Sequence, residues 1–293
     1  MILVDFNGVA VSVLFSQGMN GQAIQENLVR HMILNTLRSY NVKYRNDYGQ
    51  MILCCDGGGV WRKEIYAHYK GCRAKNREAS SIDWESFFKI LNSVRDEIRE
   101  FVPFKVVQVY GAEADDVIAT LVETTQEFGQ GENVMIVSAD HDFIQLQKYS
   151  NVSQFSPMTK KVIKDKNPLR HLREKILRGD SGDGVPNILS DGDTFMIPGG
   201  RQKPLSSKKV EEWITSWPDV GGTPNIPPDL LGNYNRNRTM VDLSCIPDDI
   251  KKKILAEYGA CKVPHNSRLL SYLIEKRCSM LTGAASEFFP ARQ

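Results

Sequence analysis

Four short apolar runs place the strongest limit on how this chain can fold. They are MILVDF (1–6), MILCCD (51–56), FKVVQVYG (104–111) and NVMIVSAD (133–140). Each run is hydrophobic almost throughout, which is typical of strands buried on both faces of a parallel sheet. Stripes of apolar residues at helical spacing lie between the runs, within 24–40, 84–101 and 117–122. Alternating strands and helices predict an α/β sheet with right-handed crossover connections.

The second half of the chain differs in character. Beyond about residue 160 the strand pattern fades, and helical patterns alternate with stretches rich in glycine, proline and asparagine. We therefore expect a central, mainly parallel sheet flanked by helices in residues 1–160 and a helical C-terminal region in residues 161–293. No stretch approaches the length of a membrane span, and six cysteines without a C-x-x-C pair indicate reduced thiols in a cytoplasmic protein.

Acidic residues follow every predicted strand. The carboxyl ends of strands in such a sheet share one edge, and neighbouring strands lie about 4.8 Å apart. Two carboxylates about 5 Å apart repel by roughly 3 kcal/mol at an effective dielectric near 20, so the cluster needs protons or divalent cations. Oxygen ligands without histidine or cysteine favour Mg²⁺ or Mn²⁺. The predicted metal ligands are Asp5, Asp56, Glu113, Asp115, Asp140 and Asp142.

A further acidic pair lies in the glycine-rich stretch LRGDSGDGVPN (177–187), at Asp180 and Asp183. Aspartate and glycine also populate turns for local reasons, so this pair alone is a weak indication. Added to six acids, it predicts a site for two metals, which would activate a water and stabilise the leaving oxygen of a phosphodiester. Without these eight acids the formal charge shifts from +2 to +10, and a basic body suits a polyanionic substrate.

Basic and aromatic residues alternate in segment 61–81. Cations that track phosphates and rings that stack on unpaired bases together predict a surface for single-stranded nucleic acid. An ordinary amphipathic, solvated helix is the alternative interpretation. The cations are Arg62, Lys63, Lys70, Arg73, Lys75 and Arg77, and the aromatics are Trp61, Tyr66 and Tyr69.

The turn at 179–184 follows a basic helical pattern and suggests a helix–turn–helix element. Exposed backbone N–H groups in such a joint can hold duplex phosphates without reading the base sequence. Residues 161–293 would then form a helical DNA-binding domain. The expected contacts are Gly179, Ser181, Gly182 and Gly184.

Taken together, these stretches resemble the 5′ nuclease (flap endonuclease-like) superfamily, most closely its branch of ribonucleases H from T-even-type bacteriophages. The resemblance is carried by ILVDFNG, LCCDGGGVWRK, YKGCRAKNRE, YGAEADDVIA, SADHDFIQL and ILRGDSGDGV, in the family's order. It implies a Mg²⁺-dependent 5′ to 3′ nuclease with ribonuclease H and flap endonuclease activity. Such an enzyme removes RNA primers and adjacent DNA during lagging-strand replication.

The resemblance also implies roles for single residues. Asp5, Asp56, Glu113, Asp115 and Asp140 would surround the first metal, and Asp142, Asp180 and Asp183 the second. Lys70 and Arg62 would contact the scissile phosphate, with Arg73 as a weaker assignment. Two Mg²⁺ ions, replaceable by Mn²⁺, and a potassium ion at the 179–184 turn are the implied cofactors. RNA–DNA hybrid, 5′-flap DNA, nicked duplex, a single-strand-binding protein and a sliding clamp are the implied partners of a monomer.

For Asp116, His141 and the terminal segments we expect roles outside the metal site. Asp116 should cap a helix, and His141 should point away from the acids because side chains alternate along an extended segment. The chain starts directly in its first strand, which leaves clamp recruitment in question. The terminal SEFFPARQ is expected to be a packed apolar tail, with a clamp-binding peptide as the alternative.

Two other functions could account for some of these motifs. A haloacid-dehalogenase-like phosphatase would need a second acid in D-x-D, where this chain has Asn7, and its late G-D-x-x-x-D motif should follow a strand. A non-catalytic, structure-specific DNA-binding protein would not require eight acids at these positions. Both rivals therefore explain the sequence less well than a metal-dependent nuclease.

Overall fold

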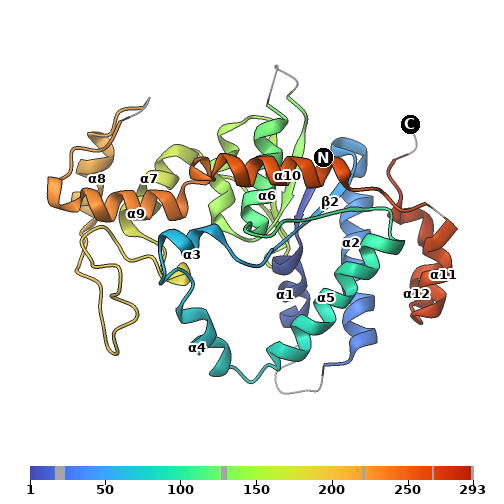
Figure 1. The fold of residues 1–293 in the computed structure, drawn as a ribbon. Helices are drawn as coiled ribbons and strands as arrows, with labels where there is room; N and C mark the ends of the chain where they lie inside the picture. The colour runs from blue at the N-terminus through green and yellow to red at the C-terminus, as the bar shows by residue number, and fades with distance from the viewer. Residues whose placement is uncertain (17–23, 127–130, 220–221, 266, 292–293) are drawn as a thin grey trace. The chain divides into compact units, whose positions relative to one another are not determined.

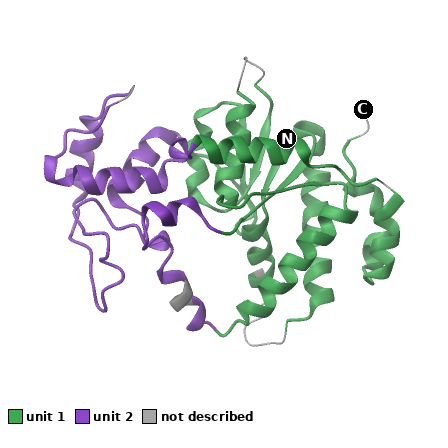
Figure 2. Ribbon diagram, in the orientation of Figure 1, with its two compact units in different colours: residues 1–58, 81–164, 248–293 green, residues 59–80, 165–247 purple. Residues whose placement is uncertain are grey.

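The structure is a computed structural model that describes residues 1–16, 24–126, 131–219, 222–265 and 267–291 (Figure 1). By its internal contacts the chain forms two compact units (Figure 2). Unit 1 comprises residues 1–58, 81–164 and 248–293, and unit 2 comprises residues 59–80 and 165–247. These boundaries differ from the expected division into 1–160 and 161–293, because the C-terminal helices pack with the sheet.

Unit 1 contains a six-stranded sheet with the order β3-β2-β1-β4-β5-β6. Its strands are β1 (Ile2–Asp5), β2 (Met51–Cys55), β3 (Lys105–Gln108), β4 (Val134–Val137), β5 (Val152–Ser156) and β6 (Lys161–Ile163). The first five strands pair in parallel, and β6 runs antiparallel to β5. The four predicted strands and the mainly parallel sheet are confirmed. Strands β5 and β6 were missed because β5 is interrupted by polar residues and β6 is short and exposed at the edge.

Helices cover both faces of this sheet. They are α1 (Phe6–Ser16), α2 (Glu26–Tyr48), α5 (Trp84–Phe101), α6 (Ala114–Thr124), α10 (Asp248–Ala260), α11 (Ser267–Glu275) and α12 (Ser279–Thr282). Ile2 and Val4 point into a core with α1, α2 and α5, and Leu3 between them points the other way, as strand geometry requires. Helix α6 packs on β1, β2 and β3, and α10 packs on α6 and β3 (Figure 1).

A buried ion-pair network joins three of these helices. Arg30 of α2 is only 2% exposed and donates from Nε to Glu97 of α5 at 2.7 Å. Glu97 also accepts a hydrogen bond from the Tyr272 hydroxyl of α11 at 2.8 Å and pairs with Lys276 at 3.1 Å. Tyr272 stacks on Phe101, with ring centroids 5.1 Å apart. The C-terminal helices are therefore integral to unit 1.

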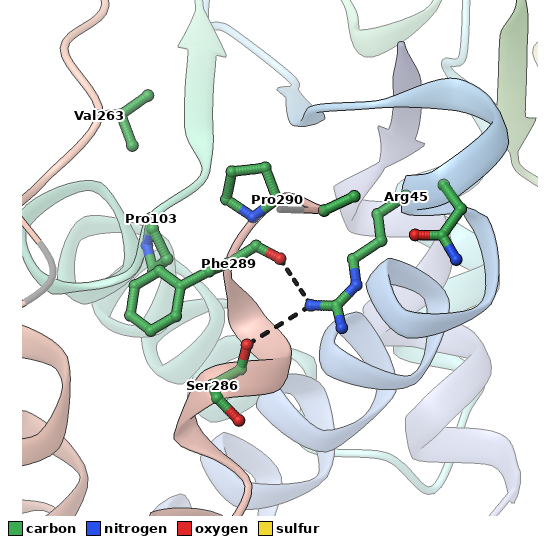
Figure 3. A pocket seen from close by; sticks show the side chains of 8 residues that line it. Arg45, Pro103, Val263, Ser286, Phe289 and Pro290 are labelled. Carbon is green, nitrogen blue, oxygen red and sulfur yellow. Dashed lines mark hydrogen bonds between the residues drawn. The ribbon is translucent and has the colours of Figure 1, made fainter. Parts of the chain in front are cut away.

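The C-terminal segment is packed, as expected of an apolar tail. Phe288, in the 3-10 helix Ala285–Phe288, is fully buried and lies against Phe104. Arg45 of α2 donates from Nη1 to the backbone O of Phe289 at 2.7 Å and of Ser286 at 3.4 Å (Figure 3). A groove of about 870 Å³ runs between this tail and α2. Because Phe288 belongs to the core, it cannot serve as an exposed clamp-binding side chain.

Unit 2 is helical around its own core. Its helices are α3 (Trp61–Ile65), α4 (Cys72–Glu78), α7 (Pro168–Arg178), α8 (Ser207–Thr215) and α9 (Leu231–Val241). These helices confirm the predicted helical character of the region. Tyr66 and Tyr69 pack with residues of α7, α8 and α9, so their rings have a structural role. No described helix is long and apolar enough to cross a membrane.

The predicted helix–turn–helix element is not confirmed. Helix α7 ends at Arg178, and a single 3-10 turn, Ser181–Asp183, follows. The next α-helix, α8, begins only at Ser207. The turn at 179–184 is therefore not joined directly to a second helix.

Candidate metal centre

Asp5 ends β1 at the carboxyl edge of the sheet. Its Oδ1 accepts a hydrogen bond from the backbone N of Gly8 at 2.9 Å, and its Oδ2 accepts one from Ser138 Oγ at 2.9 Å. A Cβ added to Gly8 would lie 2.3 Å from Asp5 Oδ2, so a glycine is needed to leave room for the carboxylate. The Asp5 carboxylate is thus fixed from two sides by the chain itself.

Asp56 directly follows β2, the strand paired with β1. Its Oδ1 accepts a hydrogen bond from the backbone N of Ala114 at 2.9 Å, and its Oδ2 accepts one from Asn7 Nδ2 at 2.7 Å. Ala114 is the first residue of α6, where the positive end of the helix dipole favours a carboxylate. Gln108 of β3 also donates from Nε2 to the backbone O of Asp56 at 2.8 Å. Three other elements therefore position Asp56.

The segment after β4 brings Asp140 and Asp142 to the same edge. Ser138 links Asp5 with Asp140, because its hydroxyl donates to Asp5 and accepts from the backbone N of Asp140 at 3.1 Å. Asp140 Oδ1 in turn accepts from the backbone N of Asp142 at 2.8 Å. Buried Gln154 of β5 donates to the backbone O of Asp140 at 2.6 Å. This loop is therefore held by a strand that the sequence pattern did not reveal.

The local structure at His141 differs from the prediction. A 3-10 helix spans His141–Lys148, so the segment is not extended and strand alternation does not set the direction of His141. Its side chain is exposed.

Helix α6 carries the EADD acids. Glu113 is its N-cap, and a capping box joins it to Asp116, whose Oδ2 accepts from the backbone N of Glu113 at 2.9 Å. The capping role expected for buried Asp116 is confirmed. The Glu113 carboxylate takes part in the same box, accepting from the backbone N of Asp116. Asp115, one residue before Asp116, is half-buried.

Negative charge is crowded at this edge. Burial raises the pKa of Asp5 to about 6, and the charges of Asp56 and Asp140 add to the rise, against the hydrogen bonds from Gly8 and Ser138. A divalent cation would relieve this repulsion, and carboxylate oxygens are suitable ligands for Mg²⁺. In the described parts of the chain, no three His, Cys, Asp or Glu side chains are close enough together to enclose an ion. The negative charge and the donor types of this edge suit a cation, although the described side chains do not by themselves enclose one.

Asp180 and Asp183 belong to unit 2 and have cationic partners there. Asp180 pairs with Lys175 at 2.8 Å and caps the turn by accepting from the backbone N of Gly182 at 2.8 Å. Asp183 pairs with Arg73 and, at 3.6 Å, with Lys70. Burial acts to raise the pKa of Asp183, but the charges of Lys70 and Arg73 outweigh it, so this pKa is lowered. Six predicted ligands thus lie in unit 1 and two in unit 2.

Two predicted phosphate contacts differ in their exposure. Lys70 has a side chain 15% exposed, and its backbone N donates to the backbone O of Asp183 at 2.8 Å, with a left-handed φ of 56°. Arg62 is 2% exposed, lies over the Trp61 ring and donates from Nε to the backbone O of Met240 at 3.2 Å. Arg62 is therefore packed inside unit 2, while Lys70 lies nearer the surface.

The rest of segment 61–81 divides in the same way. Lys63, Arg73 and Arg77 are exposed, and the side chain of Lys75 lies outside the described residues. The predicted stacking role of the aromatics is wrong for this arrangement, because Trp61, Tyr66 and Tyr69 are 5%, 7% and 2% exposed. Tyr66 and Tyr69 belong to the core of unit 2, and an amphipathic pattern alone cannot distinguish such a core from a substrate surface.

The glycines of the 179–184 turn use their N–H groups internally. Gly179 donates to the backbone O of Lys175 at 2.8 Å and Gly184 to that of Ser181 at 3.2 Å. Gly182 donates to Asp180, as described above. Ser181 is exposed at the tip of the turn. The amides expected to bind phosphate are therefore engaged within the turn.

Three positioning residues were missed by sequence reasoning. Asn7, Ser138 and Gln154 hold the carboxylates of Asp56 and Asp5 and the backbone of Asp140. Asn7 and Ser138 lie in the very motifs that carry the acids, DFN and SAD, so their nearness in sequence was an available sign. Gln154 gave none, because it comes from the unpredicted strand β5.

Comparison with known protein families matches nearly the whole chain. A family model described as 5′-3′ exonuclease, N-terminal resolvase-like domain, matches residues 1–175. A second, described as T4 RNase H, C terminal, matches residues 169–288.

Individual proteins give the same result. The chain is 33% identical to the ribonuclease H of Enterobacteria phage T4, over 98% of this chain and 95% of that protein. It is 29% identical over 167 residues to a 5′-3′ exonuclease of Buchnera aphidicola, covering 55% of each. A crystal structure of the bacteriophage T5 flap endonuclease, a pseudo-enzyme–product complex with DNA and metal ions, has a TM-score of 0.61 and 18% identity. It covers 89% of this chain and 98% of its own, a likeness of fold.

Proposed function

Because this chain belongs to the family of 5′-3′ exonucleases with a resolvase-like N-terminal domain, we propose that it is a divalent-metal-dependent 5′ nuclease. It hydrolyses phosphodiesters of RNA primers and adjacent DNA by ribonuclease H and flap endonuclease activity. One observation carries this proposal: Asp5, Asp56 and Asp140 come from distant parts of the chain to one edge of the sheet, where Ser138 bonds to both Asp5 and Asp140 and the charges of Asp56 and Asp140 act on Asp5. The family membership also agrees with the resemblance drawn from the motifs.

The proposed cofactor is a pair of Mg²⁺ ions, which Mn²⁺ can replace. Asp5, Asp56, Glu113, Asp115, Asp140 and Asp142 would be ligands at the sheet edge, Asp180 and Asp183 are further proposed ligands, and a potassium ion is proposed at the 179–184 turn. When bound, such ions supply an activated water and stabilise the departing oxygen. The chain itself contributes carboxylates already oriented by Gly8, Asn7 and Ser138. The metal ions in the T5 flap endonuclease structure, which has a similar fold, support a dependence on metal.

Lys70 is the proposed cationic contact to the scissile phosphate, and Arg73 would support it. The proposed contacts to the neighbouring phosphates of the nucleic acid are exposed Lys63, exposed Arg77 and Lys75. The Lys70 ammonium group lies 3.6 Å from the Asp183 carboxylate. Arg62, buried against the Trp61 ring, would act on substrate only through the segment that it supports.

The proposed substrates are RNA–DNA hybrid, 5′-flap DNA and nicked duplex, and the DNA in the T5 complex supports them. We further propose that the enzyme is a cytoplasmic monomer that meets a single-strand-binding protein and a sliding clamp during replication. Ser181 and the glycines of the 179–184 turn would lie on the duplex side.

The test uses 5′-labelled RNA–DNA hybrid and 5′-flap DNA with Mg²⁺. We expect Asp115→Asn and Asp142→Asn to abolish cleavage and to leave duplex binding largely intact, because each removes a proposed metal ligand. Asp249→Asn, which changes an exposed side chain of α10, is the matched control and should cleave at the wild-type rate. A small phosphate monoester is the comparison substrate, and its preferential hydrolysis would indicate a phosphatase. Full turnover by both variants would refute the assignment of the site.

A further inference from the structure

A tight turn after β3 holds an aromatic ring beside the carboxylate edge. In the turn 109–112 the last backbone N donates to the first backbone O at 3.1 Å, and Gly111 has φ of 94°, a conformation suited to glycine. Gly111 N also donates to Gly58 O at 2.7 Å, and Gly57 N donates to the last residue of the turn at 2.8 Å. Two backbone bonds thus tie this turn to the residues that directly follow Asp56.

Tyr110 lies at the outer corner of the turn. All ten tyrosines of the chain fall in the described ranges, and Tyr110 alone is exposed, with 78% of its surface in contact with solvent. A Cβ added to Gly58 would lie 3.5 Å from Tyr110 Cε2, so an edge of the ring borders the Gly58 backbone. The ring therefore lies next to a residue only two positions after Asp56.

A shallow groove of about 520 Å³ adjoins this ring. It runs between the turn and helix α10, and its lining includes Gln108, Val109, Tyr110, Lys253, Ala256 and Glu257. Gln108 also donates to the backbone O of Asp56 at 2.8 Å, so one wall of the groove continues into the carboxylate edge. Its size falls within the roughly 300–1,000 Å³ typical of small-ligand sites, which suits a nucleotide.

We propose that Tyr110 is a stacking platform for one unpaired base of the substrate, next to the scissile phosphate, and that the groove holds that nucleotide. The proposal rests on the proposed function and extends it. A base inside continuous duplex is already stacked on its neighbours, whereas an unpaired base has a free face for the ring. The turn fixes the backbone of Tyr110 in advance, so little backbone freedom is lost on binding. The buried aromatics of segment 61–81 leave this role to an exposed ring.

The first experiment measures kcat/KM for 5′-flap substrates that each carry one abasic site at a different position around the cut. With wild-type enzyme we expect one position at which loss of the base lowers kcat/KM by about 10- to 100-fold. Tyr110→Ala should lose a similar factor on the intact substrate and lose nothing further at that abasic position. Tyr110→Phe keeps the ring and should behave as wild type. Ile274→Ala, which shortens an exposed side chain of α11, is the surface control.

A second experiment reads stacking without cleavage. The same flap carries 2-aminopurine at the identified position and is bound in the presence of Ca²⁺. Wild type and Tyr110→Phe should quench its fluorescence, and Tyr110→Ala should not. The proposal would be overturned if Tyr110→Ala kept both the kcat/KM and the fluorescence quenching of wild type. It would also be overturned if the loss of kcat/KM from the abasic site and the loss from Tyr110→Ala multiplied when the two changes were combined. If wild type quenches the fluorescence but cleaves no substrate with Mg²⁺, the proposed function fails and the stacking site stands.

Discussion

At the scale of single residues, small and polar side chains decide where the carboxylates of the sheet edge lie. Gly8 leaves room for the Asp5 carboxylate where a methyl group would collide with it. Asn7 donates a hydrogen bond to one oxygen of Asp56, and Ser138 donates one to an oxygen of Asp5. Outer groups of this kind commonly change metal affinity by 10- to 100-fold when they are replaced. The acids alone therefore do not make the site.

Gly8→Ala tests this steric argument. The added Cβ, 2.3 Å from Asp5 Oδ2, must displace the carboxylate, so we expect about 10- to 100-fold weaker Mn²⁺ binding by calorimetry. Gly259→Ala on α10 is the matched control, since no atom lies within 4 Å of its Cβ and alanine favours a helix by about 1 kcal/mol. Equal Mn²⁺ affinity in both variants and wild type would show that Asp5 is not held as described.

The positions of the acids could be predicted from sequence because strand ends share one edge. Asp5, Asp56 and Asp140 follow from that rule without any knowledge of side-chain contacts. Burial could not be predicted in the same way. Arg62 and Tyr69 stand in a polar, basic segment, and only the second core of the molecule, built from residues about a hundred positions later, shows that they are inside.

At the scale of elements, Glu97 joins helices α2, α5 and α11. Burial acts to raise its pKa, but hydrogen bonds from Arg30, Tyr272 and Lys276 outweigh burial, and the pKa of Glu97 is lowered. The same carboxylate is the chief partner of Arg30, a cation with almost no access to water. The packing of three helices thus depends on one ionised group.

Glu97→Gln should lower the free energy of unfolding by about 3–5 kcal/mol at pH 7, because it leaves Arg30 buried with less compensation. A lowered pKa stabilises the fold above the ordinary value near 4.5, and this stabilisation is lost as pH falls through the folded pKa. Urea unfolding followed from pH 7 to pH 3 should therefore show the two proteins converging in acid. Glu275→Gln, exposed on α11, is the control and should track wild type. Parallel curves for Glu97→Gln and wild type would contradict the coupling.

The elements differ in how far their sequences reveal them. The strands β1 to β4 are continuous apolar runs, and α2 and α5 have clear helical stripes, so all were predicted. Helix α1 was missed because FNGVAVSVLFS is apolar on nearly every side and has no stripe. Strand β5 was missed because Gln154 interrupts it, although that residue is fully buried and bonded to the acidic loop.

At the scale of the whole molecule, each unit is built from separate stretches of chain. Unit 1 takes its last helices from residues after 247, and unit 2 takes residues 59–80 from between two elements of unit 1. Sequence patterns describe neighbours along the chain, so they could not show which distant segments share a core. The expected boundary at 160 separates residues that pack together.

Phe288→Ala tests whether the C-terminal segment completes the core of unit 1. Removing a fully buried phenylalanine should lower the free energy of unfolding by about 3–5 kcal/mol in urea titrations. Met280→Ala, at a site 83% exposed on α12, should change it by less than about 0.5 kcal/mol. A Phe288→Ala protein as stable as the Met280→Ala control would mean that the C-terminal segment does not contribute to the stability of the unit 1 core.

The placement of Phe288 has a consequence for biosynthesis. The strands of the sheet leave the ribosome first, yet Phe288, which fills part of their core, follows the last strand by more than a hundred residues. At about 5–20 residues per second, the acidic edge therefore rests on an incomplete core until Phe288 has been synthesised. Nascent chains that do not yet include Phe288 should therefore lack the rigid carboxylate arrangement and the activity that depends on it.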